Sequence, residues 1–269
     1  LKTAKALKEH NFSAVSLANN HSMDYGVIGL QQTLDALQAQ GIKSFGAGEN
    51  DSAARKPILL KRLLSGRVFS FIVAAGFEYR RKYNDIYSFY AGKNKSGVNA
   101  WTLDRAIEQI SKIREKYPNA FLIAYPHFGK KYKWKTKEQT TLAHALIDAG
   151  ADLVIGHGAH MLQEIEQYGE GWILFSLVNF VFNSPGRYQK KKVDPFSMVA
   201  RLDLTRGRDS PVYSLRLYPI FSYNQLTNYQ PRYLSEYEFL RAQELLYLHS
   251  PNKDNLEGKM RTGIDSNGR

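Results

Sequence analysis

Residues 142–160 read LAHALIDAGADLVIGHGAH, and this stretch decides the fold class. Apolar side chains recur at the spacing of one helical face from Leu142 to Ala149, which predicts a helix. Leu153–Ile155 then predicts a short buried strand that runs directly into a loop carrying His157 and His160. A helix followed by a strand that opens into a polar loop is typical of an α/β protein.

The same alternation extends outward over most of the chain. Strands alternate with helices in the first half and hairpins enter in the second, which predicts an α/β fold with mixed sheets. Residues 77–100 are polar and aromatic and are predicted to form a loop. We expect one domain over residues 1–250 and a flexible tail over 251–269. The remaining helices are predicted at 1–10, 27–40, 103–113 and 235–249, and the strands at 12–18, 42–45, 58–62, 68–74, 121–125, 162–168, 172–177, 196–204 and 212–219.

The composition fits a folded protein with a sizeable core. Of 269 residues, 43% are hydrophobic and 23% are charged, which excludes wholesale disorder and a fibrous protein. The chain has no cysteine, so a disulfide framework, a thiolate nucleophile and a zinc site built on sulfur are excluded. No apolar run reaches the ~18 residues that a membrane-spanning helix needs. The first residue is Leu1 and not methionine, so we expect a fragment or a processed product, with any signal or anchor lying upstream.

The chain is strongly basic, with 37 lysines and arginines against 25 acidic residues and a net charge of +12. Such an excess suggests nucleic acid, an anionic membrane or an acidic substrate as a partner. The basic residues concentrate in three clusters, at 80–82, 130–137 and 187–192. No helix-turn-helix, RNA-recognition or zinc-finger signature is present, which disfavours nucleic acid.

Four polar clusters follow predicted strands. They are Asn19–His21, His127, the 156–160 loop and Asn179. Ligands bind at strand ends in open α/β sheets, and imidazole and the asparagine carboxamide oxygen are normal ligands of borderline divalent metals. A single loop histidine is usually solvated or bonded to a carbonyl, but the whole set favours a metal site. The helical His10, His144 and His249 carry no such pattern.

Five motifs in order resemble those of the CapA (poly-γ-glutamate capsule biosynthesis) family, which belongs to the calcineurin-like metallophosphatase superfamily. The match covers residues 12–183, and each motif alone is weak whereas the ordered set is specific. The motifs are Asn19-Asn20-His21, Gly46-Ala47-Gly48, His127-Phe128-Gly129, Gly156-His157 with His160, and Ser176-Leu177-Val178-Asn179-Phe180.

The resemblance implies a four-layer α/β/β/α sandwich with a two-metal site for ions of the manganese, iron or zinc class. Its metal ligands would be Asn20, His127, His157 and His160, and the catalytic His21 would sit beside the substrate oxyanion. Residues expected to bind substrate are Lys130, Lys131, Lys133, Asn179 and Arg187.

The expected function is metal-dependent hydrolysis or transfer on an anionic cell-envelope polymer, such as poly-γ-glutamate or a phosphorylated envelope precursor. The alternative is a non-catalytic subunit that binds the polymer for capsule assembly or export. The resemblance also suggests membrane subunits of capsule synthesis as partners, and a membrane-associated or extracytoplasmic location in a bacterium.

The sequence departs from the family at several positions. The family has an aspartate-bearing strand and an Asn-Leu-Glu motif before the Asn-Asn-His loop, so we expect this chain to lack carboxylate ligands. Gly158 stands where a second histidine is frequent, and Val178 stands where the family has glycine. Lys130 and Lys131 stand where an acidic residue is common.

Overall fold

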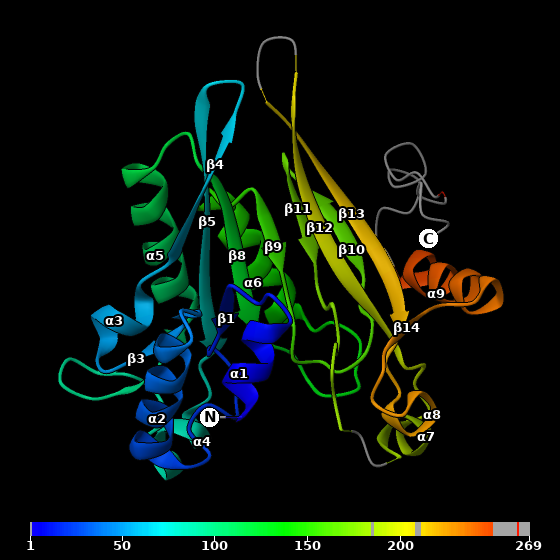
Figure 1. The fold of residues 1–269 in the computed structure, drawn as a ribbon, viewed down its shortest axis with the longest axis horizontal. Coiled ribbons are helices and arrows are strands. Elements are labelled where there is room, and N and C mark those ends of the chain that lie inside the picture. The colour runs from blue at the N-terminus through cyan, green and yellow to red at the C-terminus, as the bar shows by residue number, and fades with distance from the viewer. Residues whose placement is uncertain (1, 184–185, 208–210, 250–262, 264–269) are drawn as a thin grey trace. The chain divides into compact units, whose positions relative to one another are not determined.

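The computed structural model describes residues 2–183, 186–207, 211–249 and 263. The chain divides into two compact units (Figure 1). Unit 1 comprises Leu1–Arg62, Phe69–Phe128 and Thr141–Val154, and unit 2 comprises Leu63–Val68, Gly129–Thr140 and Ile155–Arg269. The expected single domain over 1–250 stays a prediction, and the expected tail over 251–269 lies outside the described residues except for Gly263.

The elements of the first half alternate as the sequence predicts. Their order is α1 (Lys2–Glu9), β1 (Ala14–Ser16), α2 (Gly26–Ala39), β2 (Lys43–Phe45), β3 (Ala47–Gly48), α3 (Asp51–Arg55), β4 (Ile58–Leu64), β5 (Arg67–Glu78), α4 (Arg81–Tyr87), β6 (Gly97–Val98), β7 (Ala100–Trp101), α5 (Leu103–Lys116), β8 (Phe121–His127), α6 (Lys137–Asp148) and β9 (Leu153–Ile155).

Hairpins dominate the second half, again as predicted. The order continues with β10 (Ile165–Tyr168), β11 (Gly171–Leu174), α7 (Arg187–Lys191), β12 (Phe196–Arg206), β13 (Pro211–Phe221), α8 (Asn224–Thr227), β14 (Arg232–Tyr233) and α9 (Glu236–His249). The α/β class with mixed sheets is confirmed, and the four-layer arrangement stays a prediction. None of the described helices combines the length and apolarity needed to cross a membrane.

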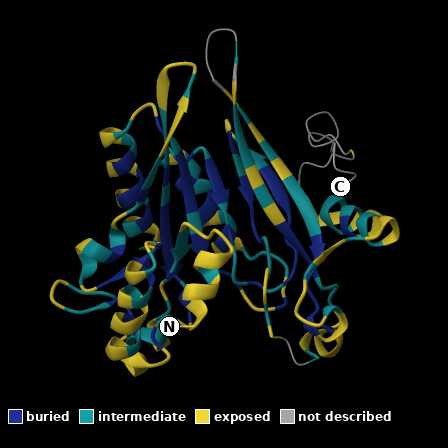
Figure 2. Cartoon of the chain, viewed as in Figure 1, coloured by how far each residue is buried: buried dark blue, intermediate teal, exposed yellow. Residues whose placement is uncertain are grey.

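Parallel strands joined by helices form the centre of unit 1. β5 pairs in parallel with β8, and β8 pairs in parallel with β9. α5 and α6 make these connections, because parallel neighbours need a crossover segment between them. Thr102 caps α5, since its side chain accepts a hydrogen bond from the Arg105 amide at 3.3 Å. Buried residues concentrate on β5 and β8 (Figure 2).

The prediction of a loop over residues 77–100 is wrong in part. The segment contains α4 and β6, and β5 continues to Glu78. Its aromatic side chains explain the difference, because the rings of Tyr83 and Phe89 pack edge-on against Phe77 at 5.4 and 5.6 Å. Phe77 and Phe89 are buried, so the segment folds around its own apolar cluster.

Unit 2 is built on antiparallel pairs. β10 pairs with β11, and β12 pairs with β13 along its whole length. The sheet of β12 and β13 packs on α9 through a core that includes Tyr188, Phe196, Phe221 and Ala242. The helix α7, which the sequence reading did not predict, contributes Tyr188 to this core.

Candidate functional site

The Asn19–His21 loop of unit 1 is held by its own hydrogen bonds. It follows β1, and Asn19 Oδ1 accepts a hydrogen bond from the His21 amide at 2.9 Å. His21 Nδ1 lies 2.8 Å from Asp24 Oδ2, and His21 Nε2 lies 3.1 Å from Asn20 Nδ2. A carboxylate can only accept, so Nδ1 carries the proton when the imidazole is neutral and Nε2 accepts from the amide. Because Asn20 Nδ2 donates to His21, the nearly buried Asn20 can offer a cation only its Oδ1 atom.

His127 is the last residue of β8 and is nearly buried. It opposes Phe77 in the parallel ladder, and the two rings meet edge to face at 5.3 Å. A Cβ built on Gly46 would lie 2.6 Å from the Ala18 side chain and 3.2 Å from that of Ala75. The residue before the Asn19–His21 loop therefore lies close to β5, two residues before Phe77. Asn20, His21 and His127 thus lie at the same end of unit 1.

His157 and His160 belong to unit 2, on the loop that follows β9. The loop is fixed at its start, because the Gly156 amide donates to the Leu174 carbonyl at 2.7 Å and the Leu177 amide donates to the Gly156 carbonyl at 3.1 Å. At its end, His160 Nδ1 lies 2.8 Å from Asn179 Oδ1. The structure therefore brings together two predicted site residues that are 19 positions apart in the sequence.

Asn179 is in turn bonded to α7, because its Nδ2 donates to the Tyr188 hydroxyl at 2.6 Å. Burial raises the pKa of the Tyr188 phenol, so this hydroxyl stays protonated at neutral pH. Arg187 precedes Tyr188 and is exposed. The predicted substrate residues Asn179 and Arg187 are thus connected through one helix.

The lysine run separates into two groups. Lys130, Lys131 and Lys133 are exposed, whereas Lys135 forms an ion pair with the buried Glu166 at 3.1 Å. Lys135 Nζ also lies 4.4 Å from the centre of the Phe175 ring, so this lysine is part of the core of unit 2. The Tyr132 amide donates to the Ala159 carbonyl, which holds the exposed lysines beside the loop of His160.

The predicted site residues therefore form two groups. Unit 1 carries Asn20, His21 and His127, and unit 2 carries the others, namely Lys130, Lys131, Lys133, His157, His160, Asn179 and Arg187. Within the part of the chain that the structure describes, no three or more His, Asp or Glu side chains are arranged to hold a metal ion. The donor types suit a divalent cation, but the ligands present do not by themselves make a complete centre.

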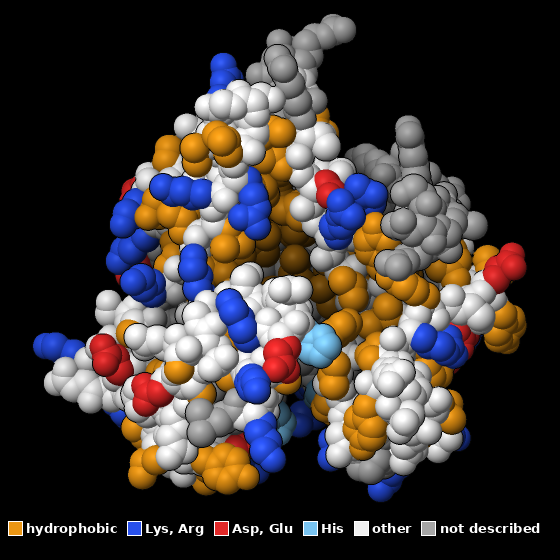
Figure 3. All heavy atoms as spheres, viewed as in Figure 1, with side chains coloured by type: hydrophobic (Ala, Val, Ile, Leu, Met, Phe, Trp, Pro, Cys, Tyr) orange, Lys and Arg blue, Asp and Glu red, His pale blue; other side chains and the backbone are white. Residues whose placement is uncertain are grey.

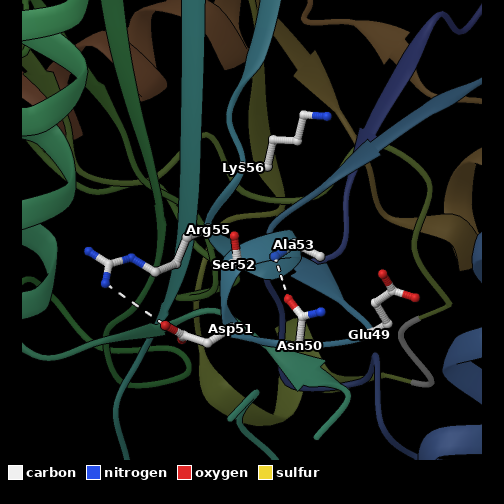
Figure 4. A pocket seen from close by; sticks show the side chains of 7 residues that line it. All are labelled: Glu49, Asn50, Asp51, Ser52, Ala53, Arg55 and Lys56. Atoms are coloured by element: carbon white, nitrogen blue, oxygen red, sulfur yellow. Dashed lines mark hydrogen bonds and ion pairs between the residues drawn. The ribbon is translucent and has the colours of Figure 1, made fainter. Parts of the chain in front are cut away.

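A separate open hollow of about 650 Å³ lies in unit 1 (Figure 4). Its polar groups serve the local fold. Asn50 Oδ1 accepts a hydrogen bond from the Ala53 amide at 2.9 Å, and Asp51 pairs with Arg55 and Arg105. None of the predicted site residues lines it, and we assign it no function. Its lining residues are Glu49, Asn50, Asp51, Ser52, Ala53, Arg55 and Lys56.

Lysine and arginine side chains are dispersed over unit 1 on the face that Figure 3 shows. They do not gather there into one continuous stripe.

Sequence reasoning missed the residues that orient the candidate histidines. Asp24 follows His21 by three residues, and this spacing was a usable signal. Tyr132, Phe182 and Tyr188 gave no signal, because only the fold brings their rings to His160 and its partner.

Comparison with known proteins supports one family. The family described as "Bacterial capsule synthesis protein PGA_cap" matches residues 2–184. The chain is 36% identical over 185 residues to the capsule biosynthesis protein CapA of Bacillus anthracis, covering 68% of this chain and 43% of that protein. It is 35% identical over 187 residues to the PGA biosynthesis protein CapA of Bacillus subtilis, covering 68% of this chain and 46% of that protein. A probable polyglutamine synthesis accessory protein of Mycobacterium tuberculosis is 30% identical over 223 residues, covering 80% of this chain and 56% of that protein. The chain thus spans less than half the length of the two Bacillus relatives.

Proposed function

Because the chain belongs to the bacterial capsule synthesis protein family PGA_cap, we propose that it binds and processes an anionic cell-envelope polymer of the poly-γ-glutamate type. The reaction we propose is metal-dependent hydrolysis or group transfer. The membrane subunits of capsule synthesis are the partners we propose.

The observation that carries the proposal is the position of the exposed lysines in unit 2. Lys130, Lys131 and Lys133 lie on the segment whose Tyr132 amide is bonded to Ala159, next to His160. Three solvated ammonium groups beside a candidate catalytic loop would raise the local concentration of a polyanion. Arg187, on the helix bonded to Asn179, would add a further cation on the same unit.

We propose that Asn20, His127, His157 and His160 are ligands of divalent cations. We also propose that carboxylate ligands, in addition to these four residues, complete the centre. Such cations, when bound, would activate a water molecule and polarise the attacked centre. His21 is the candidate for transferring or stabilising a proton at the substrate. Asp24 holds its Nδ1–H, which orients the ring and fixes the tautomer.

A non-catalytic polymer-binding subunit is the second candidate function. The observation that favours it is the lack of a three-donor group among the described His, Asp and Glu residues. Both candidates require the polymer to bind, and they differ only in whether its chain length changes in the presence of metal.

The binding step is tested by replacing Lys130, Lys131 and Lys133 together with glutamine in this chain. If each exposed contact contributes about 0.5 kcal/mol, the triple variant should bind poly-γ-glutamate roughly tenfold more weakly at low salt. Its affinity should also depend less on salt, because fewer screened contacts remain. Isothermal titration calorimetry at low and high salt measures both quantities.

The matched control replaces Lys8, Lys43 and Lys61, three exposed lysines of unit 1, with glutamine. It therefore has the same net charge as the first triple variant. Equal loss of affinity in the two triple variants would show that only net charge matters, and the lysines beside His160 would then have no special role.

A further inference from the structure

His160 is held on three sides in unit 2. Its ring stacks on Phe182 at 4.8 Å with an interplanar angle of 27°, and on Tyr132 at 5.6 Å with an angle of 25°. Its Nδ1 atom lies 2.8 Å from Asn179 Oδ1. The ring plane and one ring nitrogen are therefore both fixed by neighbours from other segments.

Hydrogen bonds beyond Asn179 fix the segment that carries this residue. The backbone amide of Asn179 donates to Ser197 Oγ at 3.2 Å, and Ser197 Oγ lies 2.7 Å from Ser222 Oγ. Ser222 Oγ donates to the Pro195 carbonyl at 3.3 Å, and this carbonyl can only accept. Since the Ser222 proton is used there, Ser222 Oγ accepts from Ser197 Oγ.

The hydrogen bond to Tyr188 gives the orientation of the Asn179 side-chain amide. Asn179 Nδ2 donates to the Tyr188 hydroxyl at 2.6 Å, so the nitrogen of the side-chain amide faces Tyr188. Asn179 Oδ1 then faces His160, and an amide oxygen can only accept. The proton of a neutral His160 must therefore be on Nδ1. The reversed amide would require the Tyr188 hydroxyl to donate to Asn179 Oδ1, and Asn179 Nδ2 to donate to His160 Nδ1.

We propose that Asn179 and Tyr188 are positioning residues that hold His160 as its Nδ1-protonated tautomer. In this tautomer Nε2 carries the lone pair, and with this atom a histidine accepts a hydrogen bond or binds a cation. The value of this arrangement for the reaction rests on the function proposed above, whereas the tautomer itself does not. Asn179 thus acts on His160, in place of the direct substrate contact expected from the sequence.

The backbone supports a built site at this place. Of the nine described residues other than glycine with a positive φ, three lie here, with φ of 57° at Tyr132, 60° at His160 and 72° at Val178. Tyr132 stacks on the His160 ring, and Val178 directly precedes Asn179. Such angles are strained in residues with a Cβ and persist where the surrounding structure overdetermines them.

The test is the ¹⁵N NMR signature of His160 in the complete 269-residue chain, recorded at a pH where the imidazole is neutral. The signal is assigned by its loss in His160→Gln. We expect a protonated Nδ1 and a deshielded, unprotonated Nε2. A protonated Nε2 in the wild-type chain overturns the proposal, because it means that the amide has the reversed orientation.

Variants separate positioning from folding. Asn179→Ala should shift His160 toward the Nε2-protonated form, whereas Asn179→Asp keeps an acceptor oxygen and should retain the Nδ1 proton. Tyr188→Phe should shift the tautomer partway, because the amide loses the acceptor that orients it. The control is Asn183→Ala, since Asn183 accepts from Asn224 and Tyr229 instead. An unchanged tautomer in both Asn179→Ala and Tyr188→Phe refutes the positioning role.

Failure of the two ideas can be told apart. If the tautomer is as proposed but the chain binds no poly-γ-glutamate, the proposed function fails and the positioning role stands. If the polymer binds but His160 is protonated on Nε2, the positioning role fails and the proposed function stands.

Discussion

Val178 has a φ of 72°, a region that L-residues enter at a cost of about 1–2 kcal/mol, and a β-branched side chain is especially unsuited to it. The residue precedes Asn179, whose side chain reaches His160. The family resemblance places glycine here, and glycine adopts this angle without steric cost. The chain therefore carries backbone strain next to its candidate site.

We expect Val178→Gly to be more stable than Val178→Ala by about 1 kcal/mol, because both variants lose the two γ-methyl groups and only alanine keeps a Cβ in the left-handed region. Urea denaturation of the two variants measures the difference. The control is the same pair at Val199, in the extended strand β12, where alanine should be the more stable residue. The same order of stability at both positions would contradict the strain at Val178.

At the scale of the element, α9 begins with a reciprocal cap. The Ser235 amide donates to Glu238 Oε2 at 2.8 Å, and the Glu238 amide donates to Ser235 Oγ at 3.3 Å. Arg232 binds the same carboxylate with two hydrogen bonds of 2.7 Å. These bonds, chiefly those from Arg232, lower the pKa of Glu238 to about 2.

This lowered pKa predicts a loss of stability in acid. The folded pKa lies below the unfolded value of about 4.3, so the contribution is complete above that value and disappears as the pH falls toward about 2. Glu238→Gln should lower the free energy of unfolding at pH 7 by about 1 kcal/mol and weaken its decline over this range. Urea unfolding at several pH values measures both effects, with the exposed Glu236→Gln as the control. A decline unchanged by Glu238→Gln would mean that other carboxyl groups cause it.

At the scale of the whole molecule, the candidate ligands are divided between the two units, with Asn20 and His127 in unit 1 and His157 and His160 in unit 2. Metal affinity depends on the number and charge of the ligands, and carboxylates are what hold two cations close together. The described His, Asp and Glu residues contain no three-donor group.

We therefore expect this chain, after dialysis, to retain less than one divalent cation per molecule, whereas the longer CapA of Bacillus subtilis should retain more. Elemental analysis of both proteins measures this. Adding manganese and poly-γ-glutamate and following polymer length then separates catalysis from binding. A tightly held stoichiometric metal in this chain, lost in His127→Gln or His160→Gln, would show that the residues present suffice.

Local patterns were enough to predict most of the elements. The apolar period predicts α2, and the short run Leu153–Ile155 predicts β9 with its observed bounds. Thr102 as a cap and Ser65-Gly66 as a hairpin turn are also local signals, since both turn residues have the positive φ that such a turn requires. These features depend on neighbours within a few residues, so the sequence by itself determined them.

Only the tertiary structure decided the surroundings of the polar residues in the candidate site. Lys133 and Lys135 look alike in the sequence, yet one is exposed and the other pairs with Glu166 in the core. Likewise, only the fold sets the side-chain amide of Asn179 between His160 and Tyr188. Burial and the direction of a hydrogen bond are set by partners far along the chain, and no local pattern contains those partners.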